Sequence, residues 1–447
     1  MRMFCSSCGA RNNDGAKFCN SCGASLEPAA DAAAPGVEPE TAAIAPPRSW
    51  RVWLIALGVA GTLGAGVVAW QAFGPSGGGS SSARVKDWPL VVTVGNKCAA
   101  VDRTGKLVIG PVYDWLGDFG EGGLAPFTQN ELWGFVRENG EVAINPQFKQ
   151  AGPFGANGLA PVMIGDRWGF IDSEGQTVIQ PQFDGAQAFD NTGYAWVQLG
   201  QVWGRIDQVG KYAVTPQFKS AGDFSNGLAA VQVGDRWGAI DSAGKLVVTP
   251  QFDGLAAFNA AGLAVARTGD RSGLVNREGR YVVSPAYDMI QMDGDESLIP
   301  VRQGELWGYI DKTGKLAITP IYNDTNPFYG GKLAVVKVQN RAGYIDRSGK
   351  LAITPQYDYA GPFLDGLAVV TVGERGGLID QTGKYVISPQ FKTLYRARHQ
   401  YGGGVDDFAP YYFTANTLDR WGVLDSAGKE LIAPQFDSIG CNVQRGE

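Results

Sequence analysis

Residues 159–184 read LAPVMIGDRWGFIDSEGQTVIQPQFD, and this stretch decides the fold. The apolar, β-rich run from Leu159 to Ile164 predicts a strand. Gly165-Asp166 predicts a two-residue hairpin turn, because such turns need a residue that tolerates positive φ. A second strand is then expected over Trp168–Asp172, antiparallel to the first.

A second turn and a third strand follow directly. Asp172 in the first position and Gly175 three residues later fit a type I turn closed by a left-handed residue, which returns the chain over Gln176–Ile179. Pro181 is expected to end the pairing, because proline has no N–H for the ladder. The unit is thus a three-stranded meander, too small to bury its apolar face alone, so neighbouring units must stack.

The same pattern recurs throughout the C-terminal part of the chain. Its ten copies are marked by Trp-Gly at Trp133, Trp168, Trp203, Trp237, Trp307 and Trp421, and by Cys98, Ser272, Ala342 and Gly376 in the Trp place. Consecutive places are 34 or 35 residues apart, except the last, which is 45. A fixed period of this length indicates a repeat architecture.

Trp-Gly, Asp-x-x-Gly-Lys and Pro-x-Phe at constant period resemble the WG-repeat family of bacterial proteins, over Trp88 to Cys441. The resemblance implies an all-β structural and interaction repeat, often attached to a membrane anchor. Two arrangements stay open. An open, curved stack is favoured over a closed, propeller-like toroid, because propellers usually have about four to eight blades of four strands.

The N-terminal segment has the spacing of a metal site. Cys5, Cys8, Cys19 and Cys22 form two Cys-x-x-Cys pairs, each followed by Gly, and four thiolates suit one tetrahedral Zn²⁺. The segment resembles the zinc-ribbon family, and we expect one structural zinc ion. Two disulfides or a redox role are the disfavoured alternatives.

An uncharged run of 22 residues, Val52–Phe73, is long enough to cross a bilayer as a helix, and Trp50, Trp53 and Trp70 flank it like interfacial aromatics. The expected division of the chain is a zinc ribbon (1–26), an Ala/Pro/acidic tether (27–49), a transmembrane helix (50–73), a Gly/Ser linker (74–87) and the repeats (88–447).

The orientation follows from a small charge bias. Arg48 and Arg51 abut the N-terminal end of the span, which favours a cytosolic N-terminus in the bacterial cytoplasmic membrane and periplasmic or extracellular repeats. A four-thiolate zinc site in a reducing compartment agrees with this topology. Ala56, Ala60 and Gly64 form a small-x-x-x-small seam through which the span could form a homo-oligomer.

Composition disfavours several function classes. A net charge of −6 and a pI near 5.1 argue against a nucleic-acid partner, which needs clustered Lys and Arg. The single His, His399, leaves little scope for His-based acid/base chemistry, so the chain is predicted not to be an enzyme.

Ten extra residues before Trp421 are the one departure from the constant repeat spacing. They include Tyr395, Arg396, Arg398, His399 and Tyr401, which are candidate binding residues because insertions in repeat arrays often decorate a binding face. The alternative is that the insertion is a surface loop without a binding function.

Three recurrent features receive structural interpretations. The aromatics share the period of the fold and are assigned to the core rather than to a ligand-stacking ladder. The Asp of Asp-x-x-Gly is assigned to turn capping rather than to calcium. The arginines beside the hairpin turns are expected to be neutralised locally by the preceding acids, Arg167 by Asp166, Arg236 by Asp235, Arg271 by Asp270 and Arg420 by Asp419.

Cys98 and Cys441 are the only thiols outside the ribbon. A disulfide needs Cα atoms within about 7 Å, and an open stack would hold its ends far apart. Two separate thiols are therefore predicted, with Cys98 a small filler in the Trp place.

Two functions are compatible with these features. The first is a membrane-anchored binding or scaffold protein that presents the repeats to a protein or an envelope polymer. The alternative is a transmembrane sensor whose zinc ribbon is the cytosolic output module.

Overall fold

The computed structural model describes residues 89–120, 122–292, 297–329, 331–396, 411–414, 420–425 and 429–441, together with the strand residues 3–4 and 11–12. The chain divides into two compact units, Met1–Ala60 and Gly61–Glu447. In the first unit, β1 (Met3–Phe4) pairs antiparallel with β2 (Arg11–Asn12). The predicted tether, span and linker, with the Ala56, Ala60 and Gly64 seam, lie outside the described residues. Within the described part of the chain, no helix has the length and apolarity to cross a membrane.

The repeats form ten four-stranded antiparallel sheets, numbered here in chain order, and in each sheet a strand of two to four residues lies at one edge beside three strands of four to seven residues. The short strands are β6 (Trp115–Leu116), β10 (Gln150–Ala151), β14 (Gly185–Ala186), β18 (Ser220–Ala221), β22 (Gly254–Leu255), β26 (Met289–Ile290), β30 (Asp324–Thr325), β34 (Tyr359–Ala360), β38 (Thr393–Arg396) and β42 (Ser438–Ile439). The second strands are β3 (Leu90–Val94), β7 (Leu124–Gln129), β11 (Ala160–Ile164), β15 (Ala195–Leu199), β19 (Leu228–Val233), β23 (Ala264–Thr268), β27 (Ile299–Gln303), β31 (Leu333–Val338), β35 (Leu367–Val372) and β39 (Tyr411–Thr414).

The third strands, which carry the Trp-Gly place, are β4 (Lys97–Val101), β8 (Leu132–Arg137), β12 (Arg167–Ile171), β16 (Val202–Ile206), β20 (Arg236–Asp241), β24 (Arg271–Val275), β28 (Leu306–Ile310), β32 (Arg341–Asp346), β36 (Arg375–Asp380) and β40 (Trp421–Leu424). The outer strands are β5 (Leu107–Tyr113), β9 (Val142–Phe148), β13 (Thr177–Phe183), β17 (Tyr212–Phe218), β21 (Leu246–Phe252), β25 (Tyr281–Tyr287), β29 (Leu316–Tyr322), β33 (Leu351–Tyr357), β37 (Tyr385–Phe391) and β41 (Glu430–Phe436).

The third sheet confirms both predicted turns. Strands β11 and β12 are joined at Gly165, whose φ is +62°, and Met163 pairs with Trp168. At the next turn Gly175 has φ +83°, and the Asp172 carboxylate accepts the N–H groups of Glu174 and Gln176 at 3.1 and 2.8 Å. The Asp of the motif therefore caps its own turn, as predicted.

The unit has four strands rather than the predicted three, and Pro181 does not end the pairing. Strand β13 continues through Pro181 to Phe183, which pairs with Trp168, because a register shift places the proline in a bulge of the ladder. The sheet ends at this strand, so the missing N–H costs no ladder bond, and an edge proline also hinders pairing with other chains. After β13 the chain turns back into the short strand β14, which pairs with β15 of the next repeat.

The bulge explains the Gly of the Trp-Gly motif. A Cβ added to Gly169 would lie 2.5 Å from the Ile179 carbonyl oxygen and 2.8 Å from the Pro181 nitrogen. The same approach to the bulged outer strand occurs at Gly134, Gly204, Gly238, Gly273, Gly308, Gly343 and Gly377. Gly is thus required by a close backbone contact that involves a residue ten positions further along.

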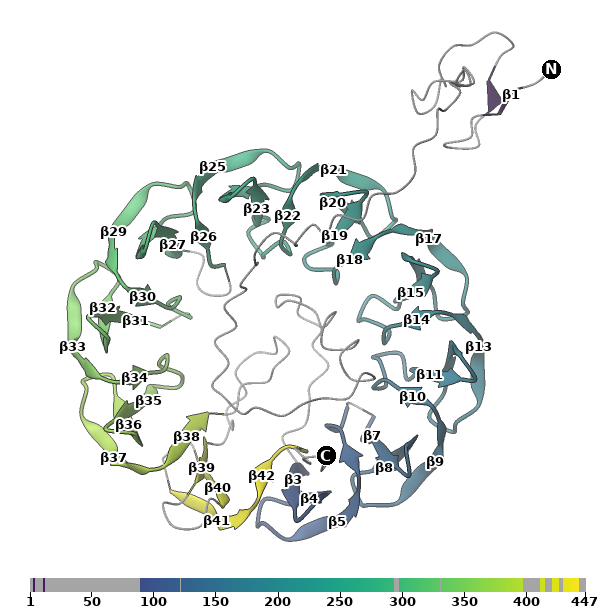
Figure 1. Cartoon of the computed structure of the whole chain (residues 1–447), viewed down its shortest axis with the longest axis horizontal. Helices are drawn as coiled ribbons and strands as arrows, with labels where there is room; N and C mark the ends of the chain where they lie inside the picture. Colours follow the sequence, from purple (N-terminus) through teal and green to yellow (C-terminus); the bar gives the residue numbers. More distant parts are fainter. Residues whose placement is uncertain are drawn as a thin grey trace, which may run out of the picture. The chain divides into compact units, whose positions relative to one another are not determined.

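The ten sheets form a closed ring, so the favoured open stack was wrong and the toroidal alternative is correct (Figure 1). Each repeat gives its trailing short strand to the next sheet. The tenth repeat has no successor, and the first sheet would otherwise lack a short strand. Strand β42 fills this place, where Ile439 pairs with Val92 and Ser438 pairs with Thr93.

The core is shared between neighbouring sheets, which confirms the packing role of the recurrent Phe residues. Phe170 and Phe183 of the third sheet form one cluster with Phe189 and Val197 of the next repeat, and Phe170 and Phe189 have ring centroids 4.9 Å apart. Because this cluster draws residues from two neighbouring repeats, stability arises between repeats as well as within them.

Candidate functional site

The two ends of the ring meet at a disulfide between Cys98 and Cys441, whose Cα atoms are 5.3 Å apart. The prediction of two separate thiols was therefore wrong. It rested on the open stack, whereas ring closure brings together residues that are 343 positions apart in the chain. Cys98 is buried in the Trp place of β4, and Cys441 follows β42.

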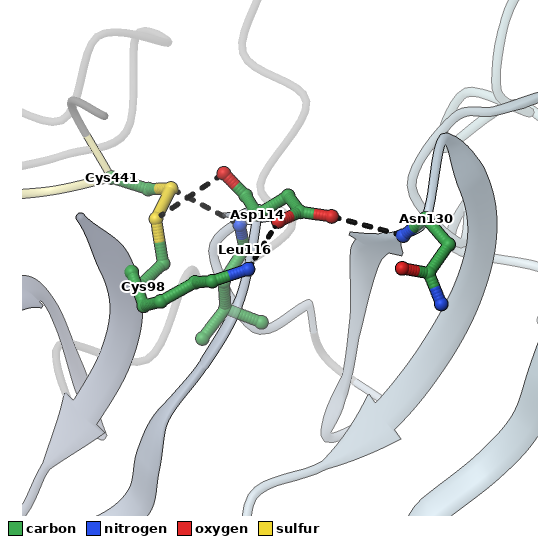
Figure 2. Close-up of polar contacts among 6 residues, drawn as sticks. Cys98, Asp114, Leu116, Asn130 and Cys441 are labelled. Carbon is green, nitrogen blue, oxygen red and sulfur yellow. Dashed lines mark hydrogen bonds and ion pairs between the residues drawn. A yellow bond between two sulfur atoms is a disulfide. The ribbon is translucent and has the colours of Figure 1, made fainter. Parts of the chain in front are cut away.

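The junction between β42 and β3, where the two ends of the ring meet, is called the seam, and hydrogen bonds surround its disulfide (Figure 2). The Leu116 N–H donates to Cys441 Sγ at 3.2 Å, and Cys98 Sγ lies 4.0 Å from the Asp114 carbonyl oxygen. On the other side of β42, the Thr93 hydroxyl donates to the Gly440 carbonyl at 3.0 Å.

Backbone bonds complete the closure. The Asp437 N–H donates to the Thr93 carbonyl at 3.0 Å, and the Gly440 N–H donates to the Val91 carbonyl at 2.8 Å. The same pair of bonds recurs at internal junctions, for example from Lys149 to Met163 at 3.1 Å. The seam therefore copies the geometry of the other junctions, with a disulfide added.

A second recurrent arrangement links neighbouring repeats through a carboxylate. Arg236 donates to Asp253, 17 residues later, at 2.5 Å, and the other oxygen of Asp253 accepts the N–H of Gly269 in the next hairpin at 2.7 Å. The same three-part link joins Lys97, Asp114 and Asn130; Arg167, Asp184 and Gly200; Arg271, Asp288 and Gly304; Arg341, Asp358 and Gly373; and, across the seam, Arg420, Asp437 and Gly95.

The expected pairing of each arginine with the preceding acid was therefore wrong. Neighbouring residues of a strand point to opposite faces, so Arg167 reaches Asp184 instead of Asp166. Asp166 accepts a hydrogen bond from Lys149 at 2.8 Å. The Gly200 N–H, offset by burial and reinforced by Arg167, lowers the pKa of Asp184. A recurrent separation of 17 residues between Arg and Asp is the sequence signal that reveals these links.

The insertion lies between the first two strands of the tenth sheet. Tyr395 and Arg396 are on β38, where they pair with Tyr412 and Tyr411. The Tyr395 ring packs edge-on against Trp421 with centroids 5.2 Å apart. Partial desolvation raises the pKa of Tyr395 to about 12, although 39% of the residue surface is exposed. The other candidates, Arg398, His399 and Tyr401, lie outside the described residues, so the binding role of this insertion remains a prediction.

The zinc ligands Cys5, Cys8, Cys19 and Cys22 also lie outside the described residues. The paired strands β1 and β2 flank Cys5 and Cys8 in the sequence, which fits a hairpin that carries the first Cys-x-x-Cys pair. The donor set, four thiolates, suits Zn²⁺. Within the described ranges, no group of three or more His, Cys, Asp or Glu side chains is arranged for a metal ion.

Sequence reasoning missed a buried arginine. Arg205 of β16 has no exposed side-chain surface and lies in the place that Phe170 takes in the preceding repeat. Its guanidinium donates to Asp190 and to the Thr192 hydroxyl, the latter at 2.6 Å, and stacks 3.9 Å from the Phe224 ring centroid. A charged residue in a recurrent apolar position was the available signal.

A second carboxylate, that of Asp223, interacts electrostatically with this cluster although the residue is exposed. Partial desolvation raises the pKa of Asp223, the charge of Asp190 adds to the rise, and Arg205 opposes it. Burial also lowers the pKa of Arg205, while Asp190 opposes that shift. Within the described part of the protein, Nε and Nη1 of Arg205 and Nε1 of Trp196 have no hydrogen-bond partner.

Comparison with family models shows which proteins share this pattern. The WG containing repeat matches ten segments, at residues 100–133, 133–168, 168–203, 203–237, 237–271, 273–307, 307–341, 343–375, 377–399 and 421–444. The chain belongs to the WG-repeat family. The zinc-ribbon domain model matches residues 4–26 of this WG-repeat protein.

Solved structures with similarity to the WG-repeat chain are remote. A eukaryotic initiation factor has 10% identity and a TM-score of 0.42, with 66% of this chain and 94% of that chain covered. Hsv2p of Kluyveromyces lactis has 12% identity and a TM-score of 0.29, covering 51% and 91%. The extracellular domain of the hybrid two component system BT4673 from B. thetaiotaomicron has 9% identity and a TM-score of 0.29, covering 77% and 64%. The search of curated proteins gave no match.

Proposed function

We propose that the protein is a membrane-anchored, non-enzymatic scaffold that presents the WG-repeat ring, outside the cytosol, to a protein or an envelope polymer. The single observation that carries this proposal is the Cys98–Cys441 disulfide. Structural disulfides persist in oxidising compartments and are rare in the cytosol. The disulfide therefore favours an extracytoplasmic ring.

The zinc ribbon requires a reducing environment, the opposite of the one that preserves a disulfide. Cys5, Cys8, Cys19 and Cys22 bind zinc as thiolates, which a reducing compartment preserves. One chain with both kinds of cysteine chemistry is best accommodated on two sides of a membrane. The uncharged run Val52–Phe73 separates the two sets in the sequence.

The recurrent residues are used by the fold itself, which directs attention to the remaining surface. Phe183 packs in the core, Asp172 caps a turn, and Gly169 allows the approach of the bulge. Partner recognition is therefore assigned to solvent-facing positions that differ between repeats and to the insertion that contains Tyr395.

Topology is tested by protease treatment of spheroplasts. Protease added to intact spheroplasts should digest the ring and leave the ribbon protected, whereas permeabilised spheroplasts should lose both. Protection of the ring in intact spheroplasts contradicts the proposal. The scaffold role is tested by co-sedimentation of the detergent-solubilised full chain with purified envelope polymer and by crosslinking in intact cells. Failure of both rejects that role.

A second candidate is a transmembrane sensor with the ribbon as its cytosolic output. The match to the zinc-ribbon domain over residues 4–26 favours it. Replacement of Cys19 and Cys22 by Ser should abolish the cellular response while the ring stays anchored and folded. An unchanged response limits the ribbon to a structural role.

A further inference from the structure

The seam of the ring differs from its nine internal junctions in the continuity of the backbone as well as in its disulfide. At an internal junction, such as the one formed by β10, the short strand belongs to the polypeptide that continues directly into the next sheet. At the seam, β42 ends the described chain and reaches β3 from the opposite end of the array. The sheets on the two sides of an internal junction stay tethered by the backbone even if their strands separate. Only at the seam can two neighbouring sheets move apart, because no backbone segment joins them directly.

The disulfide substitutes for that missing continuity. We propose that the Cys98–Cys441 bond is a redox-operated clasp: its reduction by a dithiol reductant releases β42 and opens the ring at β3 while the other junctions stay paired. This inference goes beyond the proposed function and concerns the ring itself, so it holds whichever compartment the ring occupies.

The geometry directs the reductant to one sulfur. Cys98 has no exposed surface, whereas Cys441 is partly exposed. A thiolate of the reductant therefore attacks Cys441 Sγ and forms a mixed disulfide, and the sulfur–sulfur bond breaks with its electron pair on Cys98 Sγ, which takes up a proton. The second thiol of the reductant then displaces Cys441 as a thiolate and leaves as a cyclic disulfide.

Both products have polar neighbours in place. The Leu116 N–H that now lies 3.2 Å from Cys441 Sγ would stabilise the thiolate, and the Asp114 carbonyl, 4.0 Å from Cys98 Sγ, can accept the new thiol proton. After reduction, the two residue pairs of β42, the packing of Ile439 and a few side-chain bonds hold a strand that has no direct backbone connection to the sheet it joins. Elements held by so few contacts open more readily than the longer, continuous strands.

Hydrogen exchange of the full-length chain in detergent tests the clasp. The seam amides of Asp437 and Gly440 are matched by Lys149 and Gly152, which make equivalent backbone bonds at an internal junction. In the oxidised protein all four should be protected. Reduction should accelerate exchange at the two seam amides at least about tenfold and leave the internal amides unchanged.

A Cys98→Ser/Cys441→Ser variant separates this effect from any action of the reductant on the ribbon thiols. The variant should exchange like the reduced protein and should not respond to reductant. Unchanged seam exchange after reduction overturns the proposal, because the bond would then be redundant with the strand pairing. An equal acceleration at Lys149 and Gly152 also overturns it, because the bond would then stabilise the whole ring instead of controlling the seam.

Discussion

Replacement of Gly169 by Ala measures the close backbone approach that the Trp-Gly motif provides. The added Cβ would lie 2.5 Å from the Ile179 carbonyl oxygen, whereas ordinary van der Waals contact begins near 3.4 Å. The two strands must therefore separate by nearly an ångström, or the bulge at Pro181 must rearrange. Overpacking of this kind costs about 1–3 kcal/mol.

A matched control isolates the contact from the backbone effect. Ala in place of Gly generally stabilises a compatible site by about 0.4–1 kcal/mol through the unfolded state. Gly110 of β5 has a φ outside the left-handed region and no atom within 4 Å of an added Cβ, so Gly110→Ala should show that gain alone. Gly169→Ala has the same gain but also an overpacking cost, which we expect near the upper end of its range because the contact is so short. The net loss of unfolding free energy in Gly169→Ala should therefore be about 2 kcal/mol.

The assay is urea denaturation of the full chain followed by far-ultraviolet circular dichroism, with wild type and both variants compared under oxidising conditions. If Gly169→Ala and Gly110→Ala denature at the same urea concentration, the close approach does not explain the motif.

Three further predictions concern charged groups. Asp190→Asn should lower the free energy of unfolding by about 3–5 kcal/mol because it leaves the buried Arg205 without its ion pair. Arg205→Phe should leave the free energy of unfolding, measured by urea denaturation, nearly unchanged. Equal losses of stability in the two variants would contradict this account. Partial desolvation and the charge of Asp190 raise the folded-state pKa of Asp223 above 3.8, so protonation favours the fold and this stability is lost as pH rises through the folded pKa. The loss should be small because Asp223 is exposed; Asp223→Asn should remove it in denaturation curves measured from pH 4 upward, and an unchanged pH dependence would refute it. Asp253→Ala should cost only about 0.2–1 kcal/mol because its link to Arg236 is exposed, and a loss of several kcal/mol by the same assay would show that the inter-repeat link is stronger than its exposure implies.

The sequence alone determined the two turns of the repeat unit and its period. The hairpin at Gly165 and the capped turn at Asp172 follow from local backbone chemistry, because only a few residue types tolerate positive φ or accept N–H groups two and four residues ahead. The constant period also placed the insertion that contains Tyr395 between repeats. Even the Arg236–Asp253 link was accessible in principle, because its separation of 17 residues recurs.

Only the tertiary structure decided how the repeats are joined. The short strand of each sheet comes from the preceding repeat, and the course of β13 through Pro181 depends on its being an outer strand. Closure of the ring depends on the angle that side-chain packing sets between neighbouring sheets, and a small angle repeated along the array determines whether its ends meet. The period along the chain contains no record of that angle, which is why the sequence did not show that Cys98 and Cys441, 343 residues apart, lie within bonding distance.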